Sequence, residues 1–493
     1  MLTMQRQMSR PFLILLALPA TAMGFALSVQ ISALSWILST KYGLDIHEIG
    51  LVWAAGPLAG IVGQLLIGVI SDQVWFWRGR RRPFIVIGGL LSSLMILALP
   101  NMGLISRALG LDAVLGVAIT VALALDLSIN VSFNPTRSII ADVTSEGAMR
   151  TRGYTWMQTV SGFFGVLAYA IGAWFGNYTL IYFAAILVVA FSIIPAFLIE
   201  EPRVLNRYGA AAATGPAAIA HGPGFIKLLM ILLPLWGFLA YDIIAMTLRL
   251  LHIELHNFAL EAAGGITTLL VLYVTLASRD RGVEFVREDL VEFRKILAAH
   301  SFSWIGVQTM FVYMISFVQF RFPALGNERS GQVLSISFLV LSAVGALMPA
   351  LILEPLTRRF GQIGVHATCL ALMAAGFAGV YLFGHSPVVI YAMMAIMGIG
   401  WAAIVSLPFA IMSQRVDQAR IGLYMGVFNL SVVLPQLFVS LGVGTLLSRI
   451  ASKDIIFLIG AASVGLSAIG WLFVRRHSDV IEALPATQVS AGH

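Results

Sequence analysis

The chain consists of long apolar runs separated by short polar connections. Hydrophobic residues make up 59% of its 493 residues and charged residues only 11%, whereas soluble domains carry about a quarter charged residues. A lipid-exposed span must satisfy its own backbone hydrogen bonds, and these runs are too long for the strands of a barrel. The sequence therefore predicts an all-α polytopic membrane protein.

The expected spans fall into three groups, which define the predicted domains. We expect an N-terminal six-helix bundle (1–200), a central region with a linker, an extra transmembrane hairpin and a charged cytoplasmic segment (201–296), and a C-terminal six-helix bundle with a short tail (297–493). The expected spans are residues 12–37, 49–70, 83–99, 123–143, 154–175, 178–198, 225–248, 264–277, 297–320, 333–356, 365–383, 388–412, 424–447 and 455–474.

Basic residues indicate on which side of the membrane each connection lies. Cytoplasmic loops collect Lys and Arg, and the densest basic cluster, at residues 78–82, follows the second span. We expect the protein to lie in the inner (plasma) membrane of the cell. Both termini should then be cytoplasmic. The net charge of +7 is explained by this topology without nucleic acid. The central hairpin must cross and return to preserve the pattern, which gives about fourteen transmembrane helices.

Residues 123–143 place four polar side chains inside an apolar run. They are Asp126, Asn130, Asn134 and Arg137. At about 100° per residue they fall within a sector of roughly 80°, so they share one helix face. An ionisable group at membrane depth is costly unless it is paired or reaches water. This face is the leading candidate for a transport pathway; the alternative is a structural carboxylate that pairs with an arginine elsewhere in the bundle.

A second charged cluster lies mainly between the second and third spans. Its members are Asp72, Arg78, Arg80, Arg81 and Arg82, together with Asp142 at the end of the fourth span. Pairs of carboxylates and guanidinium groups are strong and can still be broken. We expect these residues to act as a gate that holds the cytoplasmic corner closed in one state only. The alternative is that the arginines serve only to orient the chain.

Three separated blocks of the sequence resemble one known family. The blocks comprise residues 52–60 with 68–84, residues 126–142, and residues 398–401, 407–408, 422–429 and 434–436. They resemble the plant sucrose transporters and the animal proton-associated sugar transporters, in the glycoside-pentoside-hexuronide cation symporter branch of the major facilitator superfamily. The resemblance implies a major facilitator fold of two six-helix bundles. The central hairpin departs from the usual twelve-helix plan, so its role stays open.

The same resemblance implies proton-coupled symport of a sugar such as sucrose or maltose by alternating access. Asp126 matches the family's fourth-helix carboxylate and would accept the proton. Asn130 and Asn134 would then offer amides to sugar hydroxyls, and Arg137 would tune Asp126. A carboxyl in a partly dry cavity is suited to binding and releasing a proton, which agrees with this assignment.

Further binding candidates come from polar and aromatic residues in other spans. They are Gln30, Trp304, Gln308, Tyr313, Asn429 and Gln436. Aromatic rings stack on sugar rings, although in membrane helices they more often serve packing. Asn429 and Gln436 are two turns apart on one face, and Pro435 between them interrupts the backbone ladder. A lone Gln in a span more often bonds to a neighbouring helix.

Other function classes remain as alternatives. The same fold could carry a different glycoside or metabolite, or serve as a non-transporting sensor or assembly factor that docks a protein partner on the hairpin. An enzyme is least expected, because the sequence has no nucleophile and base pattern, phosphate loop or metal-ligand spacing. The single cysteine, Cys369, excludes a disulfide framework. The expected partners are a sugar, a proton and the lipid bilayer, with no cofactor, metal or nucleic acid.

Overall fold

The computed structural model describes residues 3–60, 74–111, 113–145, 148–202, 229–251, 253, 258–278, 290–416 and 421–475. Helices dominate these residues, and the β-structure within them is one isolated bridge between Phe76 and Gly79. The predicted all-α architecture is confirmed.

The helices of the first part of the chain, which we call the N-half, are α1 (Thr3–Arg6), α2 (Arg10–Val29), η1 (Gln30–Leu34), α3 (Ser35–Thr40), α4 (Ile46–Trp53), α6 (Arg82–Ala98), η2 (Leu99–Asn101), α7 (Met102–Ala108), α8 (Val114–Val143), α9 (Ala148–Phe175) and α10 (Asn177–Leu198). The central region contributes η3 (Leu233–Leu235), α13 (Trp236–Leu250) and α14 (Ala259–Ala277). The last part, the C-half, holds α15 (Leu290–Arg321), α16 (Asn327–Met348), η4 (Pro349–Leu353), α17 (Glu354–Phe360), α18 (Gln362–Phe383), α19 (Pro387–Ser413), α20 (Ile421–Phe438), η6 (Val439–Val443), α21 (Gly444–Arg449) and α22 (Ile455–Leu472).

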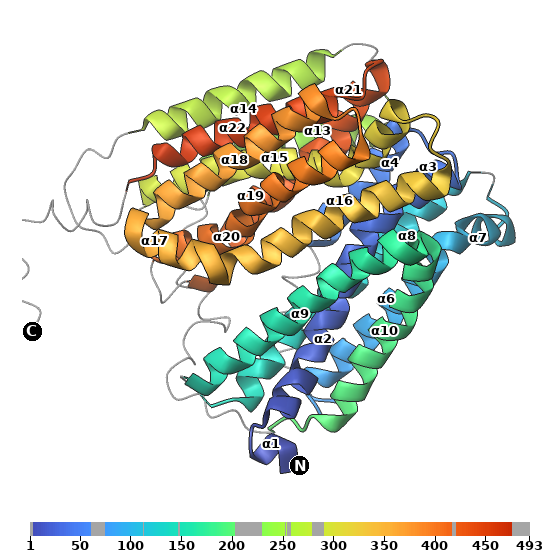
Figure 1. The fold of residues 1–493 in the computed structure, drawn as a ribbon, viewed down its shortest axis with the longest axis vertical. Helices are drawn as coiled ribbons and strands as arrows, with labels where there is room; N and C mark the ends of the chain where they lie inside the picture. The colour runs from blue at the N-terminus through green and yellow to red at the C-terminus, as the bar shows by residue number, and fades with distance from the viewer. Residues whose placement is uncertain are drawn as a thin grey trace, which may run out of the picture.

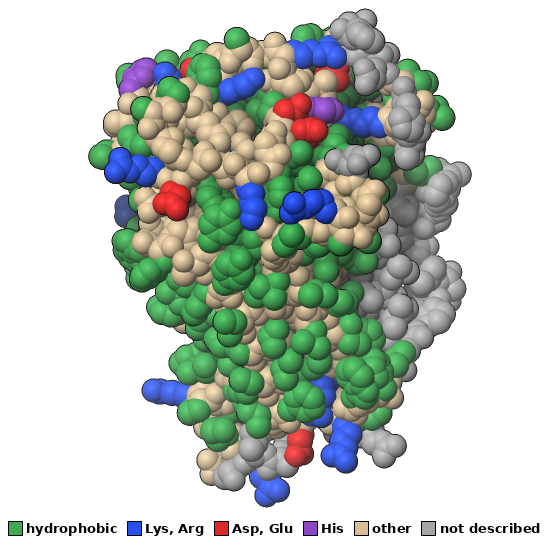
Figure 2. Space-filling model, turned by 90° about the vertical axis from the view of Figure 1, so that its right-hand side faces the viewer, with side chains coloured by type: hydrophobic (Ala, Val, Ile, Leu, Met, Phe, Trp, Pro, Cys, Tyr) green, Lys and Arg blue, Asp and Glu red, His purple; other side chains and the backbone are tan. Residues whose placement is uncertain are grey.

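Within the described residues, 12 helical stretches are long and apolar enough to cross a membrane. Two expected spans are not among them. The span at 49–70 runs into residues 61–73, which lie outside the described residues. The described part of the span at 225–248 contains a short 3₁₀ turn at Pro234 followed by the 15-residue α13. Figure 2 shows the resulting surface, with apolar side chains across the middle and most charged ones toward the two ends.

The N-half and the C-half are two groups of helices that meet at one end. In Figure 1 they converge at the end that carries α3, α4 and α21 and diverge toward α1 and α17. We call these the closed end and the open end. Helices α13 and α14 pack against each other, and α13 packs on α20 while α14 packs on α15. The central hairpin therefore lies on the C-half side of the molecule.

Direct hydrogen bonds join the two halves at the closed end. Trp36 Nε1 donates to the backbone oxygen of Asn327 at 2.8 Å, and Ser39 Oγ donates to Gln319 Oε1 at 2.9 Å. Deeper in the molecule, a buried pair of serine hydroxyls, one from each half, lies 2.8 Å apart. These contacts bury polar groups with partners, so they hold this end shut without a desolvation penalty for unpaired atoms.

The open end carries the largest concentration of basic residues and both ends of the described chain. The basic residues there include Arg6, Arg10, Arg80, Arg81, Arg82, Arg150, Arg358, Arg359, Arg415 and Arg475. Helix α1 lies at this end in Figure 1. At the last described residue, Arg475, the backbone N–H donates to Glu292 Oε2 at 2.7 Å, which ties the chain to the start of α15.

Candidate functional site

A cavity of about 1090 Å³ lies between the two halves. Its N-half wall comes from α2, η1, α8, α9 and residues 56–60, and its C-half wall comes mainly from α15, α16, α19 and α20. Of the ten residues predicted to bind substrate or proton, nine line this cavity. They are Gln30, Asp126, Asn130, Asn134, Arg137, Trp304, Gln308, Asn429 and Gln436.

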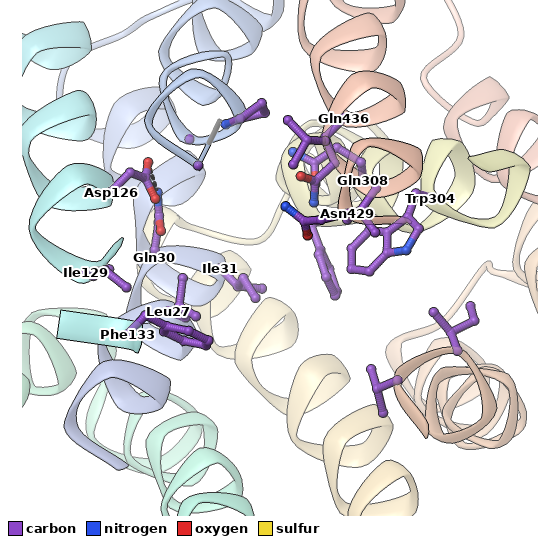
Figure 3. A pocket seen from close by; sticks show the side chains of 18 of the residues that line it. Leu27, Gln30, Ile31, Asp126, Ile129, Phe133, Trp304, Gln308, Asn429 and Gln436 are labelled. Carbon is purple, nitrogen blue, oxygen red and sulfur yellow. Dashed lines mark hydrogen bonds between the residues drawn. The ribbon is translucent and has the colours of Figure 1, made fainter. Parts of the chain in front are cut away.

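Asp126 lies on the N-half wall and is bonded to the π-helical turn η1. Its side chain is 6% exposed, and Gln30 Nε2 donates to Asp126 Oδ2 at 2.9 Å (Figure 3). A Cβ at Gly56 would lie 3.1 Å from the same oxygen, so the backbone of the second span closely approaches the carboxyl. The ion pairs among the described residues involve other carboxylates. The carboxyl therefore has an amide partner where the structural alternative expects an arginine.

The remaining polar residues of α8 extend from Asp126 toward the open end. Asn130 Nδ2 donates to the backbone oxygen of Asp126 at 2.8 Å, one turn back on the same helix. The Arg137 guanidinium lies 4.2 Å from the centre of the Phe133 ring, within the range of a cation–π interaction. The ring and the guanidinium both line the cavity. The shared face expected from the spacing is present, and Pro135 is accommodated inside the helix.

Aromatic side chains form much of the C-half wall. The ring centres of Trp304 and Trp401 lie 6.0 Å apart in a near-perpendicular arrangement, and Phe311 lies 5.5 Å from Trp401. Trp304 Nε1 donates to His300 Nε2 at 3.0 Å, and the His300 ring stacks on Phe428 at 4.8 Å. This network fixes the indole of Trp304 in one orientation, which makes it a rigid apolar face for a ligand.

Three amide side chains complete the C-half wall. Gln308 comes from α15, and Asn429 and Gln436 come from α20, where they share the face predicted from their spacing. Figure 3 shows these amides across the cavity from Asp126 and Gln30. Such groups donate and accept hydrogen bonds, so they suit a ligand with several hydroxyls.

Tyr313, the tenth predicted binding residue, lies outside the cavity lining. Its side chain is fully buried, and its hydroxyl donates to the backbone oxygen of Val439 at 3.2 Å. The aromatic character that suggested ligand stacking here serves packing against the π-helical turn η6. The structure thus places Tyr313 where the alternative interpretation of membrane aromatics expects it.

The predicted gate cluster is bonded within the N-half. Arg81 Nε pairs with Asp142 Oδ2 at 3.0 Å, joining the start of α6 to the end of α8. Arg82 Nη2 donates to the backbone oxygen of Ile199 at 2.7 Å. Arg78 is exposed, and Asp72 lies outside the described residues.

Glu201, which the sequence pattern did not single out, anchors this cluster. Its carboxylate accepts the three backbone N–H groups of residues 80–82 at 2.7–2.8 Å. An acceptor at a helix start satisfies donors that the helix leaves unpaired. The sequence offers one sign of this role: Glu201 lies three residues after α10, and a carboxylate just past the end of one span can reach the start of a neighbouring helix.

The family model of the Major Facilitator Superfamily matches residues 16–440. The chain belongs to the Major Facilitator Superfamily. It is 25% identical over 482 residues to sucrose transport protein SUC4 of Arabidopsis thaliana, covering 89% of this chain and 84% of that one. The resemblance to the sucrose transporter branch is therefore confirmed, and the chain is a membrane transporter by family and fold, in agreement with the expectation that it is not an enzyme.

Solved structures of this superfamily share the fold. A point mutant of the nucleoside transporter NupG has a TM-score of 0.62 at 12% identity, with 94% of this chain and 100% of that one covered. The inward-open xylose transporter XylE from E. coli has a TM-score of 0.58 at 13% identity, covering 94% and 96%. At these identities the likeness establishes the fold, and the major facilitator architecture predicted from the sequence is confirmed.

Some cavity residues of this major facilitator protein were not singled out as binding candidates. They include Phe133, Tyr169, His300, Phe311 and Trp401. Trp401 belongs to one of the family-like blocks, so its position carried a signal. The sequence does not single out His300, because its contact with Trp304 depends on side-chain rotamers that the sequence does not specify. Among the described residues, no group of three His, Cys, Asp or Glu side chains is placed to hold a metal ion.

Proposed function

We propose that this protein is a proton-coupled sugar symporter, with sucrose or a similar glucoside such as maltose as its substrate. The observation that carries the proposal is a buried carboxyl, Asp126, that accepts from the Gln30 amide and faces a wall of indoles and amides across one cavity. The sucrose transport protein that the chain resembles over most of its length supports the choice of a disaccharide.

Under this proposal Asp126 binds the proton and the sugar lies between the two walls. Gln30 donates to the Asp126 carboxyl and, with Asn130 and Asn134, provides amides that can contact sugar hydroxyls. The Trp304 indole offers a flat face for the sugar ring. A neutral carboxylic acid donates one hydrogen bond, whereas a carboxylate only accepts, so protonation changes what the site offers to the sugar.

We infer that the open end faces the cytoplasm, because cytoplasmic segments collect Lys and Arg and the basic residues concentrate at that end. Both termini then lie in the cytoplasm, and the protein is a multi-pass component of the plasma (inner) membrane. With this orientation the open cavity would face the cytoplasm, and rocking of the 1–200 and 297–493 bundles would expose it alternately to the two sides. Sugar biases this motion only if it binds the two states with different free energies.

The gate residues have a specific role in this cycle. The Arg81–Asp142 pair and the Glu201 cap keep the open end of the N-half preformed while the halves are apart. We propose that when the halves approach, Arg78 and Arg80 meet the C-half and hold the end closed; Asp72, the remaining gate candidate, lies outside the described residues.

Uptake into proteoliposomes tests the proposal. Labelled sucrose and maltose are offered with an imposed inward proton gradient, and separately with an inward sodium gradient at equal pH on both sides. We expect accumulation with the proton gradient, and loss of that accumulation when a protonophore is added. Accumulation driven by sodium alone would overturn the proton assignment, and the absence of uptake of either sugar by folded protein would overturn the substrate.

A different cargo on the same fold is the second candidate. The amides of Gln308, Asn429 and Gln436 recognise hydroxyls and carbonyls in general, and NupG, which has the same fold, is a nucleoside transporter. Competition of unlabelled glycosides, sugar acids and nucleosides against the labelled substrate distinguishes these possibilities.

A further inference from the structure

The first helix of the central hairpin lies in the seam between the two halves. Tyr241 and Ala245 of α13 belong to one buried apolar cluster with Ala54 of the N-half and with Leu437 and Leu441 of the C-half. The Tyr241 ring lies 4.8 Å from that of Phe438 at a steep angle. Helix α13 therefore contacts both of the bodies that move in alternating access, although the hairpin as a whole sits against the C-half.

The π-helical turn η6 is held between α4 and α13. On one side a Cβ added to Gly50 of α4 would lie 2.5 Å from the backbone oxygen of Ser440, so the two backbones are in direct contact. On the other side a Cβ added to Gly442 would lie 2.6 Å from the Tyr241 hydroxyl. The close approach on both sides leaves η6 little freedom to shift unless one of its neighbours moves.

Arg249, near the end of α13, donates hydrogen bonds to this turn and to Thr445, which lies just beyond the turn. Its Nη2 donates to the backbone oxygen of Leu441 at 2.8 Å and to Thr445 Oγ1 at 3.3 Å. Thr445 Oγ1 in turn lies 3.2 Å from Nδ1 of His47, in the first turn of α4. A continuous polar chain thus runs from the central hairpin, through the C-half, to the N-half at the closed end.

The turn that Arg249 holds is connected to the cavity. A π-helical turn leaves backbone carbonyl groups outside the regular ladder, and such turns often occur at functional sites. Here the oxygens of Val439 and Leu441 accept from Tyr313 and Arg249. Gln436, which lines the cavity, precedes the turn by three residues on the same continuous helix. Fixing η6 therefore fixes both the closed end and one polar group of the binding wall.

We propose that Arg249 is a positioning residue for the transport cycle: it fastens η6 to the central hairpin and, through Thr445 and His47, stabilises the closed end. Hydrogen bonds from a charged donor are among the stronger ones in proteins, and this donor sits in a partly buried site. When the closed end opens, α4 must leave η6, and the bond between Thr445 and His47 must break. The hairpin thereby sets the balance between the two states, and this inference depends on the motion of the halves and on neither the sugar nor the proton.

Spin-label distance measurements on sugar-free protein in nanodiscs test the inference. Labels are attached at Leu109→Cys and Val388→Cys, both exposed and at the closed end of the two halves, in a Cys369→Ser background. In Arg249→Met we expect the ratio of open to closed distances to rise by about tenfold, the size expected for a lost hydrogen bond to a charged group. In Thr445→Val, which keeps the side-chain shape, we expect a smaller rise in the same direction.

Matched variants separate positioning from general destabilisation. Thr247→Ala changes the same helix on its exposed side, where the hydroxyl bonds only to its own helix in the described contacts, and should leave the distances unchanged. Arg249→Lys should restore part of the closed population. Arg249→Met and Thr445→Val break the same hydrogen-bond network. The double variant should therefore raise the ratio of open to closed distances by less than the product of the two single effects. An unchanged distance distribution in folded Arg249→Met, or in Thr445→Val if the arginine variant does not fold, would overturn the proposal.

Discussion

The two walls of the cavity differ in chemistry although they belong to similar helical bundles. The N-half wall holds the charged groups Asp126 and Arg137, whereas the described C-half lining contains no Asp, Glu, Lys or Arg and instead presents indoles and amides. A carboxyl can bind a proton, and a charged group responds to the membrane potential, whereas the imidazole of His300, on the C-half wall, uses its Nε2 to accept the Trp304 N–H. This difference suggests that proton coupling and sugar recognition reside on opposite walls. A substitution on one wall should therefore remove one of these functions and leave the other intact.

The largest expected effect is the loss of coupling in Asp126→Asn. A gradient of one pH unit is worth about 1.4 kcal/mol per proton and can support an accumulation of about tenfold. We expect the variant to reach an accumulation ratio of about one, because the amide cannot carry the proton. Exchange of labelled for unlabelled sugar across the membrane, measured at equal pH on both sides, should survive, since the C-half wall is intact. Undiminished accumulation in this variant would contradict the assignment of proton coupling to Asp126 on the N-half wall.

Trp304→Ala should produce the complementary result on the opposite wall. Loss of a fixed indole that contacts a ligand ring removes stacking and apolar contact, and we expect the apparent KM for sugar to rise about tenfold. The accumulation ratio at saturating sugar should stay at its wild-type value, because Asp126 is untouched. Trp304→Phe, which keeps a flat ring, is the control and should lie between the two. A change in the accumulation ratio with an unaltered KM would contradict the assignment of recognition to this wall.

The open ends of the two halves extend the comparison to stability. In the N-half, Glu201 accepts three backbone N–H groups, while in the C-half Glu292 accepts the backbone N–H of Arg475 and pairs with Lys295 at 2.8 Å. We expect Glu201→Gln to destabilise the protein by about 2 kcal/mol, since charge-assisted bonds weaken to neutral ones. Thermal unfolding in detergent measures this effect.

Glu354→Gln is the matched control for the Glu201 variant. Its carboxylate forms an exposed pair with Arg358, and exposed pairs of this kind contribute less than about 1 kcal/mol. If Glu354→Gln lowered the stability to thermal unfolding as much as Glu201→Gln does, the Glu201 cap would stabilise the protein no more than an exposed ion pair does.

The smallest expected effect concerns Tyr313, the predicted binding residue that lies outside the cavity. Tyr313→Phe removes one buried hydrogen bond to Val439 and should lower stability by about 1 kcal/mol. The apparent KM for sugar should stay within about twofold of the wild-type value, because the hydroxyl faces η6 and not the cavity. Uptake kinetics on the purified variant, beside Trp304→Ala, check this expectation. A tenfold rise in KM would show instead that the Tyr313 hydroxyl contributes to sugar binding.

The sequence predicted the fold well because each span is encoded locally. A run of apolar residues specifies a membrane helix without reference to the rest of the chain, and the spacing of Asp126, Asn130 and Asn134 specifies one helix face without knowledge of what that face meets. The all-α major facilitator fold followed from such signals and from the family resemblance. The domain boundaries at residues 200 and 297 and the roles of the site residues stay predictions.

What the sequence did not specify depends on contacts between distant elements. The hydrogen-bond partner of Asp126 lies 96 residues away along the chain, and Gln30 reaches it because α2, which continues into η1, packs on α8. Tyr313 and Trp304 both lie on α15 and both were candidate aromatic ligands. Their different environments arise from the faces they present to other helices, which a single helix does not encode. Glu201 likewise acquires its role only when α10 is packed beside α6.

The size of the cavity has a consequence for water. A disaccharide fills only part of about 1090 Å³, and liquid water occupies about 30 Å³ per molecule, so on the order of thirty water molecules have room in the open state. In the proposed cycle, closing the two halves would expel most of them to the side that the cavity faces. The cycle therefore moves solvent as well as solute, and an osmolyte too large to enter the cavity would favour the states with less internal volume.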